Sequence, residues 1–107
     1  MSDTSEFEDR SSDWKTGTWP QKLWREAVGE TIREARTERG DRLTDIAERA
    51  GVSTQYLSEI ERGLKDPSSE VLHAVSGALD LTTREVTRRS SELIECATAR
   101  LEVFLAA

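Results

Sequence analysis

The sequence is poor in the residues that build disulfides, metal centres and catalytic sites. Among its 107 residues there is one cysteine, Cys96, and one histidine, His73. A single cysteine excludes an intrachain disulfide, and one cysteine with one histidine falls short of a four-ligand zinc site. The sequence also lacks a Gly-rich phosphate loop, a nucleophile elbow and a carboxylate pair at catalytic spacing. We therefore expect a protein that is not an enzyme and needs no cofactor.

Long apolar segments are missing as well. No apolar run approaches the roughly 20 residues that span a membrane, and the acidic start of the chain is unlike a signal peptide. We expect a cytoplasmic protein without membrane contact. The length suits one domain with a modest core and tails, because 36% of the residues are hydrophobic and 34% are charged.

Basic residues are outnumbered, and the net charge is −6. Residues 1–13 hold five acids and one arginine, a balance of −4, which leaves −2 for the rest of the chain. Since residues 1–18 have few apolar side chains to bury, we expect a disordered acidic tail. It is either simply solvated, or it competes with DNA for a basic face or engages a partner.

The tryptophans Trp14, Trp19 and Trp24 invite burial, and Trp24 should pack at the start of the first helix.

Apolar periodicity predicts an all-α protein with five helices. The first should follow Pro20 and end at Gly40. Ser68 should cap the fourth, and Thr82 with Glu85 forms a capping box for the fifth. The five helices are expected at about 21–39, 43–50, 53–62, from 68, and from 82 to near the C-terminus.

The most informative stretch is residues 43–63, LTDIAERAGVSTQYLSEIERG. Gly51 interrupts a helical pattern and can supply the positive φ of a tight turn, and Ser53 can cap a second helix. Leu57, Ile60 and Leu64 recur at helical spacing and should face the core. The outer face then carries short or polar side chains suited to base edges in a major groove, namely Thr54, Gln55, Ser58 and Glu59. The pattern predicts a helix-turn-helix that binds double-stranded DNA.

The acidic net charge weakens this prediction, because phosphate contacts supply much of the affinity of DNA-binding proteins. What matters is where the cations lie. Arg42, Arg62 and Lys65 are close in sequence to the proposed face.

Three segments together resemble the Cro/phage-repressor (XRE) helix-turn-helix family: GETIREARTERG, LTDIAERAGVSTQYLSEIERG and DPSSEVLHAVSGALDL. The resemblance spans Val28 to Leu81. The run YLSEIERG…SSEVL is also similar to the actinobacterial Clp-protease gene regulators, a branch of short activators with a dimerising C-terminal helix. The resemblance implies a Cro/repressor-like fold and a dimer on a pseudo-palindromic operator, with the second helix of the motif in the major groove.

The resemblance also implies roles for individual positions. Gln55 would pair with adenine and Glu59 would accept from cytosine N4, beside Thr54 and Ser58 on the same face. Arg36 and Glu61 would form a structural ion pair. The family often has Ser or Thr where this chain has Arg42, which weakens the cap of that helix. Phosphate contacts are implied for Arg42, Ser53, Tyr56, Arg62 and Lys65.

The last helix carries more apolar surface than a domain of this size needs. It either folds back onto its own domain or pairs with a second subunit, and we favour pairing because an exposed stripe promotes aggregation. This divides the chain into a tail (1–18), a DNA-binding domain (19–81) and a dimerisation helix (82–107). The predicted dimer interface is Val86, Leu93, Ile94, Ala97, Leu101, Phe104 and Leu105.

Two alternatives remain open from the sequence. The final Leu105-Ala106-Ala107 resembles the end of the bacterial tag for Clp proteolysis, although a frayed terminus explains it more simply. The rival function is a protein-interaction module, such as an antitoxin-like protein or an adaptor that binds RNA polymerase. The favoured function is a dimeric transcriptional regulator, and the closer resemblance adds activation of protease or stress genes.

Overall fold

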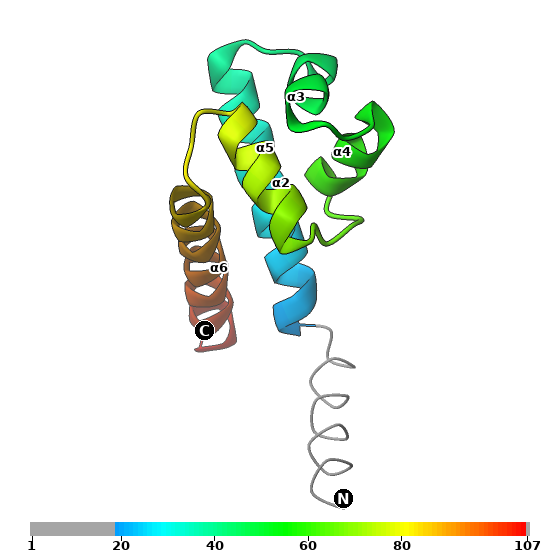
Figure 1. Ribbon diagram of the computed structural model, residues 1–107. Helices are drawn as coiled ribbons and strands as arrows, with labels where there is room; N and C mark the ends of the chain where they lie inside the picture. Colours follow the sequence, from blue (N-terminus) through cyan, green and yellow to red (C-terminus); the bar gives the residue numbers. More distant parts are fainter. Residues whose placement is uncertain (1–18, 107) are drawn as a thin grey trace, which may run out of the picture.

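The structure, a computed structural model, describes the backbone of residues 19–106 and the side chains of residues 23–103, 105 and 106. This part of the chain contains five helices and no strand, which confirms the all-α prediction (Figure 1). The predicted disordered tail, Trp14, and the side chains of Trp19 and Phe104 lie outside the described residues. The helices are α2 (Trp19–Arg39), α3 (Leu43–Ala50), α4 (Thr54–Glu61), α5 (Ser69–Ala78) and α6 (Thr83–Ala106).

The boundaries follow the capping signals closely. Gly40 adopts φ +76° just after α2, and Ser68 accepts a hydrogen bond from the N–H of Val71 at the start of α5. Helix α2 begins at Trp19, two residues earlier than predicted. Pro20 does not prevent this, because a helix has no intrahelical partner for the N–H groups of its first turn.

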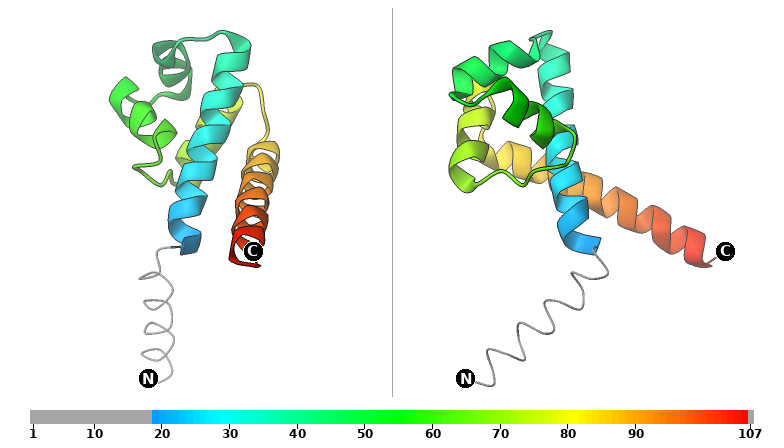
Figure 2. Two further views of the ribbon diagram at one scale, coloured as in Figure 1. Left: turned by 180° about the vertical axis from the view of Figure 1, so that it is seen from behind. Right: turned by 90° about the vertical axis from the view of Figure 1, so that its right-hand side faces the viewer.

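Helices α3, α4 and α5 pack with α2 around one core, and α6 lies along the other side of α2 (Figures 1 and 2). Trp24, at the start of α2, is half-buried against this core, as predicted. The core residues are Val28, Ile32, Ala35, Ile46, Ala47, Leu57, Ile60, Val75, Ala78 and Leu79.

Leu64 does not join this core, so its prediction as a core-facing residue is wrong. Helix α4 ends at Glu61, and Gly63 then turns the chain with φ +77°. Leu64 is left 59% exposed after this turn, with its N–H bonded to the carbonyl of Glu59. The predicted helix also stopped before Leu64, at residue 62, so the apolar spacing was wrongly continued past the end of the helix.

Val86 was predicted to lie in a dimer interface, and this is wrong, since it is fully buried within its own subunit. The first turns of α6 pack on α2, where Ser90 is also fully buried. The first part of α6 therefore folds back onto its own domain, which was one of the two sequence-based alternatives. The C-terminal part of α6 projects from the bundle (Figure 2, right). Leu93, Ile94, Ala97 and Leu101 in this part of the chain are half-buried.

Helices α2 and α4 approach each other closely at Gly29. A Cβ atom at this position would lie 2.3 Å from the carbonyl oxygen of Ile60 and 2.8 Å from that of Glu61. Both oxygens belong to the backbone at the C-terminal end of α4. Only glycine therefore allows this contact in its present geometry.

We expect Gly29→Ala to lower the free energy of unfolding by about 1–3 kcal/mol, because the two helices must separate to admit the methyl group. Urea denaturation of both proteins measures the difference. Gly77→Ala is a matched control, since Gly77 lies within α5 and a Cβ there meets nothing within 4 Å. That change should raise stability by roughly 0.5–1 kcal/mol, and equal effects at both sites would contradict the packing argument.

The start of α6 carries half of the predicted capping box. The Thr82 hydroxyl accepts from the N–H of Glu85 at 3.0 Å. The Glu85 carboxylate, however, accepts from Arg88 (2.7 Å) and Arg89 (2.8 Å). These two guanidinium groups lower the pKa of Glu85 from 4.5 to about 2.

A depressed carboxylate pKa contributes stability above the unfolded-state pKa and loses it as the pH falls towards the folded-state value. We expect Glu85→Gln to lower the melting temperature near neutral pH. The difference from the parent protein should shrink between about pH 4.5 and about pH 2. Thermal denaturation of both proteins across this range tests the expectation, and a difference that does not change with pH would refute it.

Candidate nucleic-acid interface

The turn between α3 and α4 has the conformation that the sequence predicts. Gly51 has φ +75°, and the N–H of Val52 bonds the carbonyl of Ala47 at 3.0 Å. Ser53 then caps α4, because its Oγ accepts from the N–H of Tyr56 at 3.0 Å. These local hydrogen bonds fix the angle at which α4 leaves α3.

Helix α4 exposes the polar side chains that were predicted to meet bases. Thr54 and Gln55 are exposed in its first turn, and Ser58 and Glu59 are half-buried one turn later. Residues four apart lie on the same face of a helix, so Gln55 and Glu59 form one edge of this surface and Thr54 and Ser58 the other. The four side chains are therefore brought together on one helix face.

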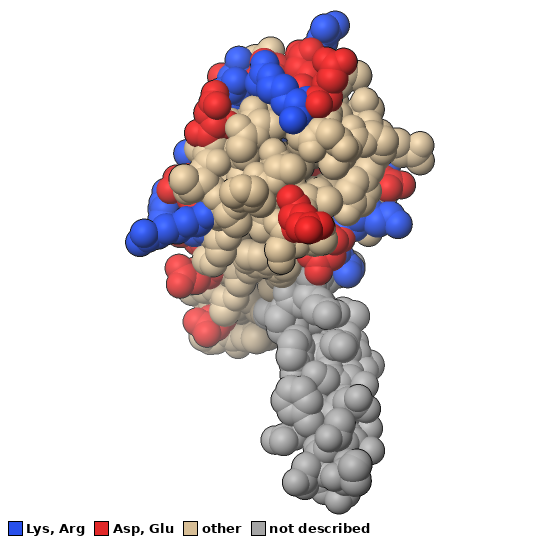
Figure 3. Space-filling model, in the orientation of Figure 1, with Lys and Arg blue, Asp and Glu red and all other residues tan. Residues whose placement is uncertain are grey.

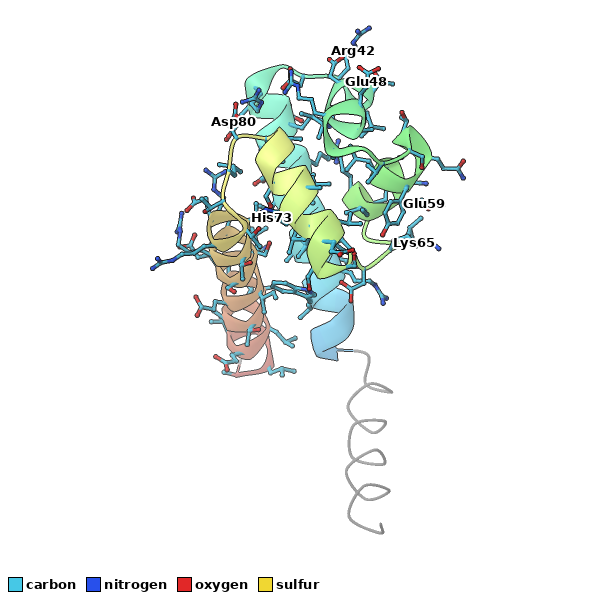
Figure 4. The ribbon with its side chains drawn as sticks, viewed as in Figure 1. Arg42, Glu48, Glu59, Lys65, His73 and Asp80 are labelled. Atoms are coloured by element: carbon cyan, nitrogen blue, oxygen red, sulfur yellow. The ribbon has the colours of Figure 1, made fainter. Side chains whose placement is uncertain are left out.

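The predicted phosphate-contacting residues border this face. Figure 4 places Arg42 at the start of α3 and Lys65 after α4, at opposite ends of the helix-turn-helix. Arg62 is exposed at the C-cap of α4, whereas Tyr56 is half-buried and packs against the core. Cations thus lie on both sides of the polar face of α4.

Arg42 does not cap α3 with its side chain, which is 81% exposed. Its backbone N–H instead donates to the Asp45 carboxylate at 3.0 Å, and the Arg42 Nε lies 3.5 Å from the same oxygen. These contacts, the backbone hydrogen bond first, lower the pKa of Asp45. The Asp45 carboxylate therefore supports the helix start, and the guanidinium of Arg42 stays open to solvent.

Arg36 and Glu61 form a bidentate ion pair between α2 and the end of α4. The Nε–Oε2 distance is 2.7 Å, the Nη2–Oε1 distance is 2.9 Å, and the Glu61 side chain is only 6% exposed. The hydrogen bonds to Glu61 raise the pKa of Arg36, so its guanidinium stays charged at any physiological pH. Arg36 also donates to the carbonyl of Asp41 at 3.1 Å. The pair holds the end of α4 against α2 and leaves the opposite face free.

Sequence reasoning missed a groove between α2 and α4, beside the polar face. Four of its residues are glutamates spaced four apart on α2, a spacing that places them in one row. The repeat is visible in the sequence, but periodicity does not show that another helix lies beside it. The groove is lined by Glu26, Glu30, Arg33, Glu34, Thr37, Glu38, Ser58, Glu61 and Arg62.

This acidic row limits where phosphates can approach, since like charges repel across a partly enclosed groove. Charges of both signs are also interspersed on the face shown in Figure 3, without one large basic area. The described residues contain no cluster of His, Cys, Asp and Glu that could hold a metal ion. None of the described helices is long and apolar enough to cross a membrane.

Comparison with known proteins identifies relatives of the central region. Residues 32–86, slightly more than half of the chain, match the model of a family described as Helix-turn-helix. The transcriptional regulator ClgR of Mycobacterium tuberculosis is 52% identical over 59 residues, which are 55% of this chain and 53% of that protein. The chain thus spans about half the length of the curated relative that it matches here.

Several solved structures are similar to this fold, including crystal structures of two regulators. The crystal structure of the clp gene regulator ClgR from Corynebacterium glutamicum has a TM-score of 0.74 and 36% identity, covering 81% of this chain and 93% of that one. The crystal structure of SinR, the master regulator for biofilm formation, in complex with DNA has a TM-score of 0.53 and 42% identity, covering 55% of this chain and 95% of that one. The predicted similarity to the Clp-protease gene regulators is confirmed. The chain belongs to the XRE-type helix-turn-helix family.

Proposed function

We propose that this protein is a DNA-binding transcriptional regulator, and not an enzyme, that binds a pseudo-palindromic site as a homodimer. The observation that carries the proposal is the exposed face of α4. Thr54 and Gln55 stand free in its first turn, and the opposite side of the helix is fixed to α2 through Gly29 and the Arg36–Glu61 pair. A rigid helix with a polar outer face suits readout of base edges in a major groove.

Each side chain of this face has a defined role in the proposal. The side-chain amide of Gln55 hydrogen-bonds adenine twice, since its oxygen accepts from N6 and its nitrogen donates to N7, and Glu59 accepts from the N4 amino group of cytosine. Thr54 and Ser58 offer hydroxyls to either kind of base edge. All four belong to α4 and lie on its solvent side.

The phosphate contacts in the proposal come from the borders of the face. The Ser53 Oγ uses a lone pair to cap α4, so its O–H is free to donate to a phosphate oxygen. Tyr56 lies beside it, half-buried. Arg42, Arg62 and Lys65 are exposed cations around the same helix. Few cations take part, so the sequence-independent affinity should be modest, and its salt dependence should correspond to a small number of phosphate contacts.

The C-terminal part of α6 supports the homodimer in this proposal. Leu105 is 71% exposed, and Leu93, Ile94, Ala97 and Leu101 on the same side of the helix are half-buried. Burying such a stripe against a second copy would remove it from water. Two recognition helices about one DNA turn apart would then meet a two-fold site. The Phe104 side chain lies outside the described residues, so its place in this interface stays a prediction.

Further partners remain predictions. ClgR from Corynebacterium glutamicum is called a clp gene regulator, and we propose protease or stress genes as targets here, with activation through RNA polymerase. Action in the cytoplasm goes with this proposal. Degradation by a Clp protease through Leu105-Ala106-Ala107 is likewise a prediction, and residue 107 lies outside the described residues.

A footprint on genomic DNA fragments tests the DNA-binding roles. We expect the protein to protect a two-fold site, and Gln55→Ala to lose about 1–3 kcal/mol of discrimination at one base position. Arg62→Ala should weaken binding to all sequences alike. It should also reduce the slope of log affinity against log salt concentration by about one, because one phosphate contact is lost. Arg84→Ala is the control, because Arg84 is an exposed cation on α6. If the parent protein protects no DNA at low salt, an adaptor that binds another protein becomes the better explanation.

Sedimentation velocity tests the dimer. Replacing both Leu101 and Leu105 with glutamate should raise the dimer dissociation constant by at least roughly tenfold, because two apolar contacts per subunit are lost. Val103→Glu is a matched control, since Val103 is 70% exposed but lies on the opposite side of α6. Equal dissociation of both variants, or none in either, would refute the proposed interface.

A further inference from the structure

Two hydroxyl groups meet in the buried contact between α2 and α6. The Oγ1 of Thr31 and the Oγ of Ser90 are 3.2 Å apart, and the two residues are 1% and 0% exposed. Among the described residues this is the only side-chain hydrogen bond that joins α2 to α6. In that part of the chain no ion pair joins these two helices. Van der Waals contacts between helices tolerate sliding better than a hydrogen bond does.

The direction of this hydrogen bond follows from the other partners of each hydroxyl. Thr31 donates its proton to the carbonyl of Ala27 at 2.8 Å, so towards Ser90 it acts as an acceptor. Ser90 donates either to Thr31 or to the carbonyl of Val86 at 2.8 Å. Each hydroxyl therefore keeps a partner in its own helix if the other is removed.

The pair favours one register of α6 on α2. A shift of α6 by one turn would bring Val86 or Ile94 opposite Thr31, and neither side chain can donate to it. A longer side chain at this point would also separate two helices that are in contact here. Buried polar contacts of this kind select one arrangement among several apolar ones.

A small change in this contact would be amplified at the end of α6. Sixteen residues follow Ser90 in the helix, a length of about 24 Å at 1.5 Å per residue. A change of about 10° in the direction of α6 would displace its end by about 4 Å over that length. Neighbouring base pairs are about 3.4 Å apart along DNA, so this displacement corresponds to about one base pair.

We propose that the Thr31–Ser90 contact sets the direction of α6, and thereby the spacing between half-sites that the dimer prefers. The inference rests on the proposed dimer through the C-terminal part of α6. Thr31 and Ser90 are positioning residues in this scheme. Thr31 lies on α2, which holds the recognition helix α4, and Ser90 lies on α6, which joins the two subunits of the proposed dimer. Neither residue touches DNA or the partner subunit.

Ser90→Ala and Thr31→Val test the inference from both sides of the contact. Neither change leaves a buried group unpaired, since the remaining hydroxyl keeps its partner within its own helix. Ser76→Ala is the matched control. Ser76 is 1% exposed and donates to the carbonyl of Leu72 within α5, and it has no partner on another helix among the described residues.

The measurement is binding to a set of duplexes that carry two copies of the footprinted half-site, separated by increasing numbers of base pairs. The parent protein should prefer one spacing over its neighbours. In both variants, the ratio of the affinity for the preferred spacing to that for the neighbouring spacings should fall roughly three- to tenfold. This is the range expected for one buried hydrogen bond. Binding to a single half-site and the dimer dissociation constant should stay unchanged. Ser76→Ala should keep the parental spacing preference even if its melting temperature falls.

Two outcomes would overturn the inference, and they differ. If the parent protein and both variants are dimers with the same spacing preference, the Thr31–Ser90 contact does not set the spacing and the proposed function stands. If the parent protein is a monomer, or ignores the spacing altogether, the proposed dimer on a two-fold site fails and this inference fails with it.

Discussion

The position of α4 depends on the missing side chain of Gly29. At this point α2 touches the backbone carbonyls of Ile60 and Glu61, so the end of α4 sits directly on α2. The bidentate pair between Arg36 and Glu61 holds the same end, largely out of solvent. One side of α4 is thereby fixed by backbone packing and charge. Its other side can then carry side chains chosen for recognition, because they contribute little to holding the helix in place.

Charge acts on this protein mainly by restricting how a polyanion can approach. Glutamates predominate in the groove on one side of α4, and Arg62 lies where this groove meets the polar face. Arg42 and Lys65 are exposed cations at other borders of the face. Repulsion from the groove and attraction at the borders favour one orientation of a phosphate backbone over others. A net charge of −6 is compatible with DNA binding when cations lie beside the polar face of α4, because the local distribution of charge decides the electrostatic potential there.

Local features were predictable from the sequence, whereas most contacts between helices were not. The Arg36–Glu61 pair is the exception, because the family resemblance implied it. Gly51 and Ser53 fix the turn through hydrogen bonds within a few residues, so the motif could be placed from the sequence alone. Leu64 and Val86 were assigned to the wrong surfaces, because periodicity says which residues share a face but not what covers it. Gly29 gives no signal in the sequence, since a helical glycine looks the same whether or not a backbone lies against it.

Helix α6 is one continuous helix that contains both residues packed on its own subunit and the residues proposed to form the dimer. Val86 and Ser90 are buried against α2, and the family match also extends to residue 86. The half-buried apolar residues begin directly after this point, on the same continuous helix. Because a helix without a kink is stiff, the contacts that fix the orientation of its first turns also determine where its last turns lie. In the proposed dimer, the packing of one subunit thus constrains how the two subunits can be arranged on a two-fold site.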